Sequence, residues 1–283
     1  MTSASFAGTV LSPGARFLPA PARHGSDGLR ARVLNVLGVQ IIDTTKAHAI
    51  ELMRTWIDSF RGRPRSIFIV NAHTLNLAWE DPEYRRILNS SDVTFSDGTG
   101  VRLAARLEGV SLRDNLVGTD LIPSLMERYP GRYRYFLLGG PKGKAERAAE
   151  GVERLIPGAR IAGVHHGFIS ENERGAAIER INAAQPDVLL VGMGNPHQET
   201  WIHHALPRLR VPISVGVGGL FDYWAGELER APLWVRRLGV EWCYIMLHHR
   251  HKWRRYLLGN PKFLWRALQT ARGRRPLDLT TLR

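Results

Sequence analysis

Residues 187–199 read DVLLVGMGNPHQE, and this stretch decides the class of fold. Its first seven residues are nearly all apolar, which is typical of a strand buried on both faces of a parallel sheet. A glycine turn follows, and the Asn195-Pro196 pair then opens a predicted helix that continues to about Leu206. A buried strand, a glycine turn and a helix in direct succession predict one unit of an alternating α/β fold.

The same alternation extends in both directions along the chain. Short apolar runs predict further strands at 33–39, 66–70, 93–95, 133–138, 160–164 and 211–215. Helices are predicted at about 44–60, from 82 onward, at 98–107, and at about 119–129, 142–155 and 172–183. This order predicts a Rossmann-like α/β domain over residues 31–226, with a mostly parallel sheet and helices on both faces.

Two flanking segments differ from this domain in composition. Residues 1–30 are rich in Ser, Ala, Pro and Gly, which predicts a disordered N-terminal tail. From Arg230 to Arg283 there are thirteen Lys or Arg and two acids, which accounts for nearly all of the net charge of +13. Because Trp and Tyr are interleaved with these cations, residues 227–283 are predicted to form a basic helical appendage that associates with a membrane. A solvated charged surface is the alternative.

The cysteine content and the length of the apolar runs bear on the compartment. Cys243 is the single cysteine, so no intramolecular disulfide can form, which fits a reducing cytoplasm. No apolar run approaches the ~20 residues that cross a bilayer. We therefore expect a cytoplasmic protein.

Glycines and polar side chains collect directly after the predicted strands. In a parallel sheet such segments lie at one edge, beyond the carboxyl ends of the strands, where ligands bind. They are Asn71-Ala72-His73, 96–100 (SDGTG), 139–143 (GGPKG), 192–199 (GMGNPHQE) and 216–222 (GVGGLFD). They predict a site for a nucleotide diphosphate, with the base or ribose held by Gln198, Glu199 or Asp222. A plainer interpretation of Asp97 is that it caps the following helix.

Motifs for other chemistries are lacking or weak. The turn with Gly139 and Gly140 differs from the G-x-G-x-x-G dinucleotide fingerprint, and no P-loop pattern occurs. No two aspartates stand two residues apart, so a D-x-D metal–nucleotide pair is also lacking. We therefore expect no metal and no cofactor, with Lys and Arg balancing the diphosphate charge. The histidines at 248, 249 and 251 sit among cations, which favours a basic surface over a metal site.

Several segments match a known family in the right order. They are 87–89 (ILN) through 97–101 (DGTGV), 118–121 (GTDL), 138–141 (LGGP), 186–192 (PDVLLVG), 196–201 (PHQETW), 218–222 (GGLFD), 230–232 (RAP) and 239–242 (GVEW). Over residues 33–268 the chain resembles the WecG/TagA/CpsF glycosyltransferases, which are glycosyltransferase family 26.

The resemblance implies an inverting, metal-independent transfer of a sugar from a UDP-sugar to a polyprenyl-diphosphate-linked saccharide in cell-surface or exopolysaccharide biosynthesis. It implies that Asp97 is the general base and that Asn71 belongs to the active site. Gln198 and Asp222 would line the UDP-sugar pocket. Lys252 and Arg255 of the appendage would meet the diphosphates. The remaining candidates for substrate binding are Gly139, Gly140, Glu199 and Arg230.

The resemblance also implies action at the inner face of the cytoplasmic membrane, and it leaves open whether the protein is a homo-oligomer. Ile69, Asn115 and Ile245 depart from the family pattern, so the donor sugar and the acceptor stay open. Two other classes of function are weighed against this one. They are a nucleic-acid-binding protein that uses the basic tail and a nicotinamide-dependent oxidoreductase. Nucleic-acid binding rests on charge alone, because neither zinc-finger spacing nor an RNP-like motif occurs, so we expect no nucleic-acid partner.

Overall fold

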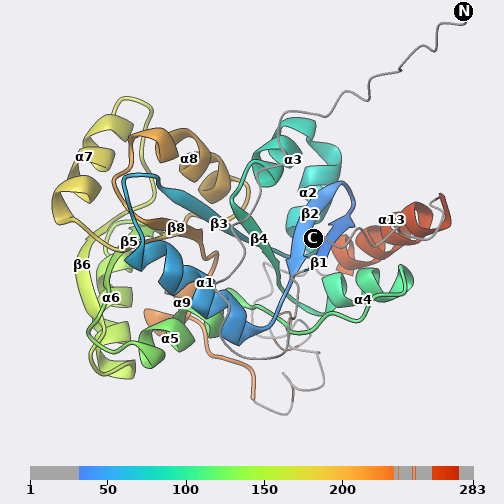
Figure 1. The fold of residues 1–283 in the computed structure, drawn as a ribbon, viewed down its shortest axis with the longest axis horizontal. Coiled ribbons are helices and arrows are strands. Elements are labelled where there is room, and N and C mark those ends of the chain that lie inside the picture. Colours follow the sequence, from blue (N-terminus) through green and yellow to red (C-terminus); the bar gives the residue numbers. More distant parts are fainter. Residues whose placement is uncertain (1–31, 233–234, 236–243, 245, 247–256, 274–283) are drawn as a thin grey trace, which may run out of the picture.

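The computed structural model describes residues 32–232, 235, 244, 246 and 257–273 (Figure 1). The predicted N-terminal tail lies outside the described residues, as do Lys252 and Arg255 of the predicted appendage. The described part of the chain is built around one parallel β-sheet.

The central sheet has the strand order β4-β3-β8-β7-β5-β6, and all of its pairings are parallel. Its strands are β3 (Arg65–Val70), β4 (Val93–Ser96), β5 (Arg134–Gly139), β6 (Arg160–His165), β7 (Val188–Gly192) and β8 (Ile213–Gly216). The predicted Rossmann-like α/β fold is confirmed. The last strand of the described residues, β8, lies in the middle of the sheet between β3 and β7.

Alternate residues of β3, β5 and β7 pack into two cores, one on each face of the sheet. In β5, Tyr135 and Leu137 belong to one core, whereas Phe136 and Leu138 belong to the other. The first core is covered by α1 (Lys46–Asp58), α5 (Gly118–Arg128), α6 (Lys144–Leu155) and α9 (Leu220–Trp224). The second is covered by α2 (Ala72–Glu80), α3 (Pro82–Asn89), α4 (Thr99–Leu107), α7 (Arg174–Ala184) and α8 (His197–Ala205), which the short 3₁₀ helix η1 (Leu206–Arg208) follows.

The first predicted strand is confirmed only as far as Val36, because a turn interrupts residues 33–39. They belong to a separate antiparallel hairpin of β1 (Arg32–Val36) and β2 (Val39–Asp43). The chain reverses at Leu37 and Gly38, which have φ of 51° and 85°. Gly38 N–H donates to Asn35 Oδ1 at 2.9 Å. Two-residue turns of this kind need left-handed backbone, which glycine adopts at no steric cost.

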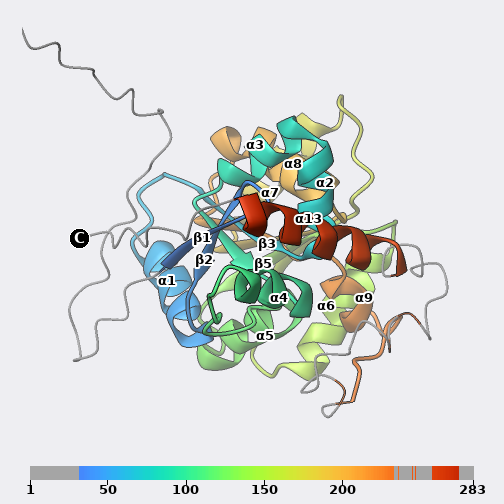
Figure 2. The ribbon, with the colours of Figure 1, turned by 90° about the vertical axis from the view of Figure 1, so that its right-hand side faces the viewer.

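The described C-terminal helix, α13 (Gly259–Gly273), packs across α2 and α4 (Figure 2). Phe263 on its inner face is completely buried, and Arg266 is nearly so. Arg266 Nη1 donates to Asn76 Oδ1 at 2.9 Å, and its Nη2 donates to Glu80 Oε1 at 2.8 Å. The described part of the predicted appendage is therefore fastened to the α/β domain by a buried, paired cation. Within the described ranges, no helix has both the length and the apolar character needed to cross a bilayer.

Candidate active site

The polar turns singled out in the sequence follow the ends of five parallel strands, so the sheet brings them to one edge. Backbone hydrogen bonds tie neighbouring turns together. Asp97 N–H donates to the Val70 carbonyl at 2.8 Å, at the end of β3. Val217 N–H donates to the Val191 carbonyl at 2.9 Å, near the end of β7. This edge is where open α/β sheets bind their ligands.

Asp97 is half-buried and immediately follows β4. The N-cap of α4 is Gly98, with φ of 90°, so Asp97 is not the capping residue of that helix. Gly98 N–H donates to Asn115 Oδ1 at 2.7 Å. Contacts to the backbone on both sides of Asp97 therefore fix its place at the edge. A carboxylate held there has the chemistry of a general base.

Asn71 stands beside Asp97, because the residues before them, Val70 and Ser96, are paired in neighbouring strands. Asn71 is the N-cap of α2, a helix that the sequence analysis did not predict. Its Oδ1 accepts hydrogen bonds from the N–H groups of His73 at 3.1 Å and Thr74 at 3.2 Å. Thr74 Oγ1 accepts the Asn71 N–H in return, which completes a capping box. These bonds fix the orientation of the Asn71 amide.

Gly139 and Gly140 form a turn that has no room for side chains. A Cβ atom on Gly139 would lie 2.3 Å from the Gly192 carbonyl oxygen. A Cβ atom on Gly140 would lie 2.6 Å from Lys144 Cδ, and Gly140 has φ of 67°. The Gly140 carbonyl accepts the Gly167 N–H at 2.7 Å. The turn therefore presents backbone at the edge, which permits the close approach of a ligand.

Gln198 and Glu199, at the start of α8, are buried, with 1% and 0% of their surface exposed. Glu199 Oε1 accepts hydrogen bonds from Asn195 Nδ2 at 2.6 Å and from Gln198 Nε2 at 2.7 Å. Glu199 Oε2 accepts the Tyr84 hydroxyl of α3 at 3.0 Å. Burial raises the pKa of Glu199 to about 6, although these hydrogen bonds oppose the rise. The carboxyl group is thus predominantly ionised at neutral pH.

Asp222 of α9 belongs to a cluster of charges at the start of α6. Lys144 Nζ lies 2.6 Å from Asp222 Oδ1 and 2.7 Å from Glu227 Oε2. Arg147 adds a second cation, 2.6 Å from Glu227. Burial favours the neutral amine, but hydrogen bonds to the two carboxylates outweigh it and raise the pKa of Lys144. Asp222 is therefore held against α6 by a charged lysine.

Arg230 is connected to the first turn of α5. Its Nη1 donates to the Thr119 carbonyl at 2.9 Å, and its Nη2 donates to Asp120 Oδ1 at 3.0 Å. The guanidinium also lies over the Tyr223 ring, 5.5 Å from its centroid. Arg230 thus links the segment after α9 to α5.

Three side chains that support this edge were missed in the sequence. No sequence pattern indicated a role for Tyr84, because its hydrogen-bond partner Glu199 is 115 residues away. Lys144 was visible just after the 139–143 turn, but only the structure pairs it with Asp222. Asn115 was noted as a departure from the family pattern, and its contact with Gly98 gives it a local role.

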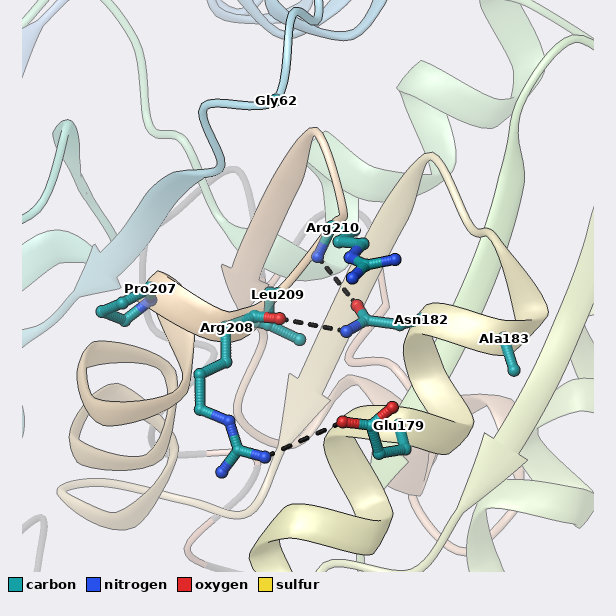
Figure 3. A pocket seen from close by; sticks show the side chains of 8 residues that line it. All are labelled: Gly62, Glu179, Asn182, Ala183, Pro207, Arg208, Leu209 and Arg210. Carbon is teal, nitrogen blue, oxygen red and sulfur yellow. Dashed lines mark hydrogen bonds and ion pairs between the residues drawn. The ribbon is translucent and has the colours of Figure 1, made fainter.

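The His, Cys and acidic side chains of the described residues form no metal centre at this edge, and a surface hollow lies elsewhere. Among the residues that the structure describes, no group of three or more His, Cys, Asp or Glu is placed to hold a metal ion. A hollow lined by Gly62, the end of α7 and residues 207–210 lies at the opposite edge, before β3 and β8 begin (Figure 3). There Asn182 Nδ2 donates to the Arg208 carbonyl, and Asn182 Oδ1 accepts the Arg210 N–H. These hydrogen bonds have a structural role at the amino end of the sheet.

A parallel α/β sheet with a carboxylate, a fixed amide and side-chain-free turns at its carboxyl edge places the chain in the class of α/β proteins that bind ligands at this edge. Comparison with known proteins narrows this class. Residues 34–276 match the glycosyl transferase WecG/TagA/CpsF family, and the chain belongs to it. It is thus a glycosyltransferase, as the sequence predicted.

The chain is similar to three curated relatives that share one name, N-acetylglucosaminyldiphosphoundecaprenol N-acetyl-beta-D-mannosaminyltransferase. The protein from Bacillus spizizenii is 34% identical over 78% of this chain and 84% of its own length. The protein from Bacillus subtilis is 30% identical over 74% of this chain and 81% of its own. The protein from Staphylococcus aureus is 28% identical over 84% of this chain and 93% of its own.

Proposed function

We propose that this protein transfers a sugar from a UDP-sugar to a saccharide carried on polyprenyl diphosphate. The names of the relatives support this acceptor class, because they specify a diphosphoundecaprenol-linked acceptor. The observation that carries the proposal is the placement of Asp97 beside Asn71, after paired residues of β3 and β4 at the ligand edge. Asp97 would then supply the general base for the family's reaction at the edge where the donor would bind.

The reaction is a direct displacement. Asp97 takes the proton from the acceptor hydroxyl as its oxygen attacks the anomeric carbon. The bond from that carbon to the UDP oxygen breaks on the opposite face, and UDP leaves with the electron pair, so the configuration inverts. Gly139, Gly140 and the 216–222 turn offer backbone groups to the diphosphate. Lys252 and Arg255 remain the predicted cationic partners of the diphosphates.

The acceptor places the reaction at a membrane surface, for which α13 and α4 offer an apolar face. Seven of the ten exposed large apolar side chains among the described residues lie on α2, on α4, on α13 or just before α13. They are Trp79, Leu103, Leu107, Leu257, Leu258, Trp265 and Leu268. Apolar side chains flanked by a basic segment are typical of helices that lie in the membrane interface. We propose that this face meets the inner leaflet of the cytoplasmic membrane.

The donor is tested by ligand-dependent thermal stability. UDP and the correct UDP-sugar are expected to raise the Tm, because a ligand at a hundred times its Kd stabilises the folded state by about 2.7 kcal/mol. NAD is expected to leave the Tm unchanged. N-acetylmannosamine is the first donor sugar to include, since the relatives are named for it. Stabilisation by NAD and not by UDP would contradict the proposal, and mass spectrometry of the product on a short-chain lipid diphosphate would identify the sugar transferred.

A further inference from the structure

Glu199 accepts hydrogen bonds from three side chains in different parts of the chain. Tyr84 comes from α3, Asn195 from the turn after β7, and Gln198 from α8 itself. No part of Glu199 is exposed, so a substrate at the sheet edge cannot touch this carboxylate. Glu199 can therefore affect a bound ligand only through the side chains to which it is hydrogen-bonded.

Gln198 connects Glu199 to the turns at the carboxyl edge of the sheet. Its amide Nε2 faces Glu199 Oε1, so its Oε1 points the other way and accepts the Gly218 N–H at 3.0 Å. The reverse orientation would set an amide oxygen against a carboxylate and an N–H against an N–H. An ionised carboxylate only accepts hydrogen bonds, and Glu199 therefore selects one orientation of the Gln198 amide.

Gly218 lies in the turn that leads from β8 to α9. Its φ of 56° is left-handed, and a Cβ atom on Gly192 would lie 3.1 Å from its carbonyl oxygen. A Cβ atom on Gly216 would lie 3.1 Å from Gln198 Nε2. The turn is thus packed between the end of β7 and the Gln198 amide. Asp222 lies four residues after Gly218.

We propose that Glu199 is a positioning residue for the donor, because through Gln198 it holds the 216–219 turn in the shape that receives the UDP moiety. This role rests on the proposed function, since it takes the turn to be one wall of the UDP-sugar pocket. It differs from the direct contact expected for Glu199 from sequence. A buried carboxylate whose pKa is raised is a costly choice for packing alone, which supports a role beyond packing.

The test compares Glu199→Met, which removes the acceptor, with Glu199→Gln, which keeps an acceptor oxygen for Asn195 and Gln198. Glu199→Met is expected to raise the KM for the UDP-sugar and the Kd for UDP about tenfold, because the Gln198 amide loses its charged partner. The KM for the lipid acceptor should stay within about twofold, since the acceptor lies on the other side of the reacting carbon. Glu199→Gln should recover most of the affinity for UDP.

Two further variants keep the test decisive. Asp92→Asn is the matched control, because Asp92 is a buried carboxylate that binds Ser66 N–H at the amino end of the sheet. It should lower the Tm and leave the Kd for UDP unchanged. Tyr84→Phe removes one donor from Glu199, and it carries the test with an expected two- to fivefold rise in the Kd if Glu199→Met does not fold.

Two results would overturn the positioning role alone. The first is wild-type affinity for UDP in folded Glu199→Met, or in Tyr84→Phe where that variant carries the test. The second is an equal loss of affinity in Asp92→Asn. A wild-type protein that binds no UDP would instead refute the proposed donor, and the role of Glu199 with it.

Discussion

At the scale of single residues, the sheet edge separates carboxylates by what surrounds them. Asp97 is half-buried, and hydrogen bonds of its own N–H and of the Gly98 N–H fix the backbone around it. Glu199 is completely buried and accepts three hydrogen bonds from side chains. Asp222 is paired with Lys144. Three acids at one edge therefore have three different environments.

The buried carboxyl group of Glu199 predicts a pH dependence of stability. Its folded pKa of about 6 is above the ordinary 4.5, so Glu199 holds its proton more tightly in the folded state than in the unfolded chain. The stability associated with that proton is present below pH 4.5 and is lost as the pH rises through 6. A shift from 4.5 to about 6 corresponds to about 2 kcal/mol.

We therefore expect wild type to lose about 2 kcal/mol of unfolding free energy relative to Glu199→Gln between pH 4 and pH 7. Denaturant titrations of both proteins at a series of pH values measure this difference. A difference that stays constant over the whole range would mean that the Glu199 carboxyl is not the group responsible.

At the scale of elements, α13 has one face packed against the domain and one face exposed. Phe263, Ala267 and Arg266 face the α2 and α4 helices, and Arg266 forms buried hydrogen bonds with Asn76. Trp265 points away from this core, with 60% of its surface exposed, and Leu258 just before the helix is 63% exposed. Trp265 and the exposed Leu268 are three residues apart and therefore lie on one side of α13, and Leu258 is a further exposed apolar side chain just before the helix.

The double variant Leu258→Gln/Trp265→Gln is expected to weaken binding to vesicles that contain anionic lipid by about tenfold or more, because each large apolar side chain contributes about 1.5–3 kcal/mol when it is fully buried. Its Tm should match wild type, since both side chains are exposed. Vesicle flotation measures the binding. Leu155→Gln, on α6, is the matched control and should bind as wild type does. Unchanged binding in the double variant would remove this face from the membrane contact.

At the scale of the whole molecule, the sequence predicted the layers of the fold but not the order of its strands. Apolar runs such as β7 predicted a two-sided parallel sheet because both faces of a strand must be apolar there. The place of β8 between β3 and β7 could not be predicted, because it depends on contacts between segments that are far apart in the chain. The hairpin was missed since Gly38 interrupts an apolar run by conformation rather than by polarity.

The candidate site was predicted in part for the same reasons. Glycine turns after strands placed Asp97, Gly139 and Gln198 at one edge, because parallel strands end together. Which side chains of this edge are buried was not predictable, since Gln198 is bonded to the turn before α9 and Glu199 to Tyr84 of α3. The sequence predicted the members of the edge, and the structure assigns their contacts.

The central claim is that Asp97 performs base catalysis at the carboxyl edge of the sheet. The most direct measurement is the kcat of Asp97→Asn with its UDP-sugar and lipid acceptor, beside Asp92→Asn at the other end of β4. We expect kcat to fall by about 10²–10⁴ in Asp97→Asn, the usual contribution of a general base, while stabilisation by UDP is retained. Asp92→Asn should keep a kcat close to that of wild type. Turnover of Asp97→Asn near the wild-type rate would contradict the account.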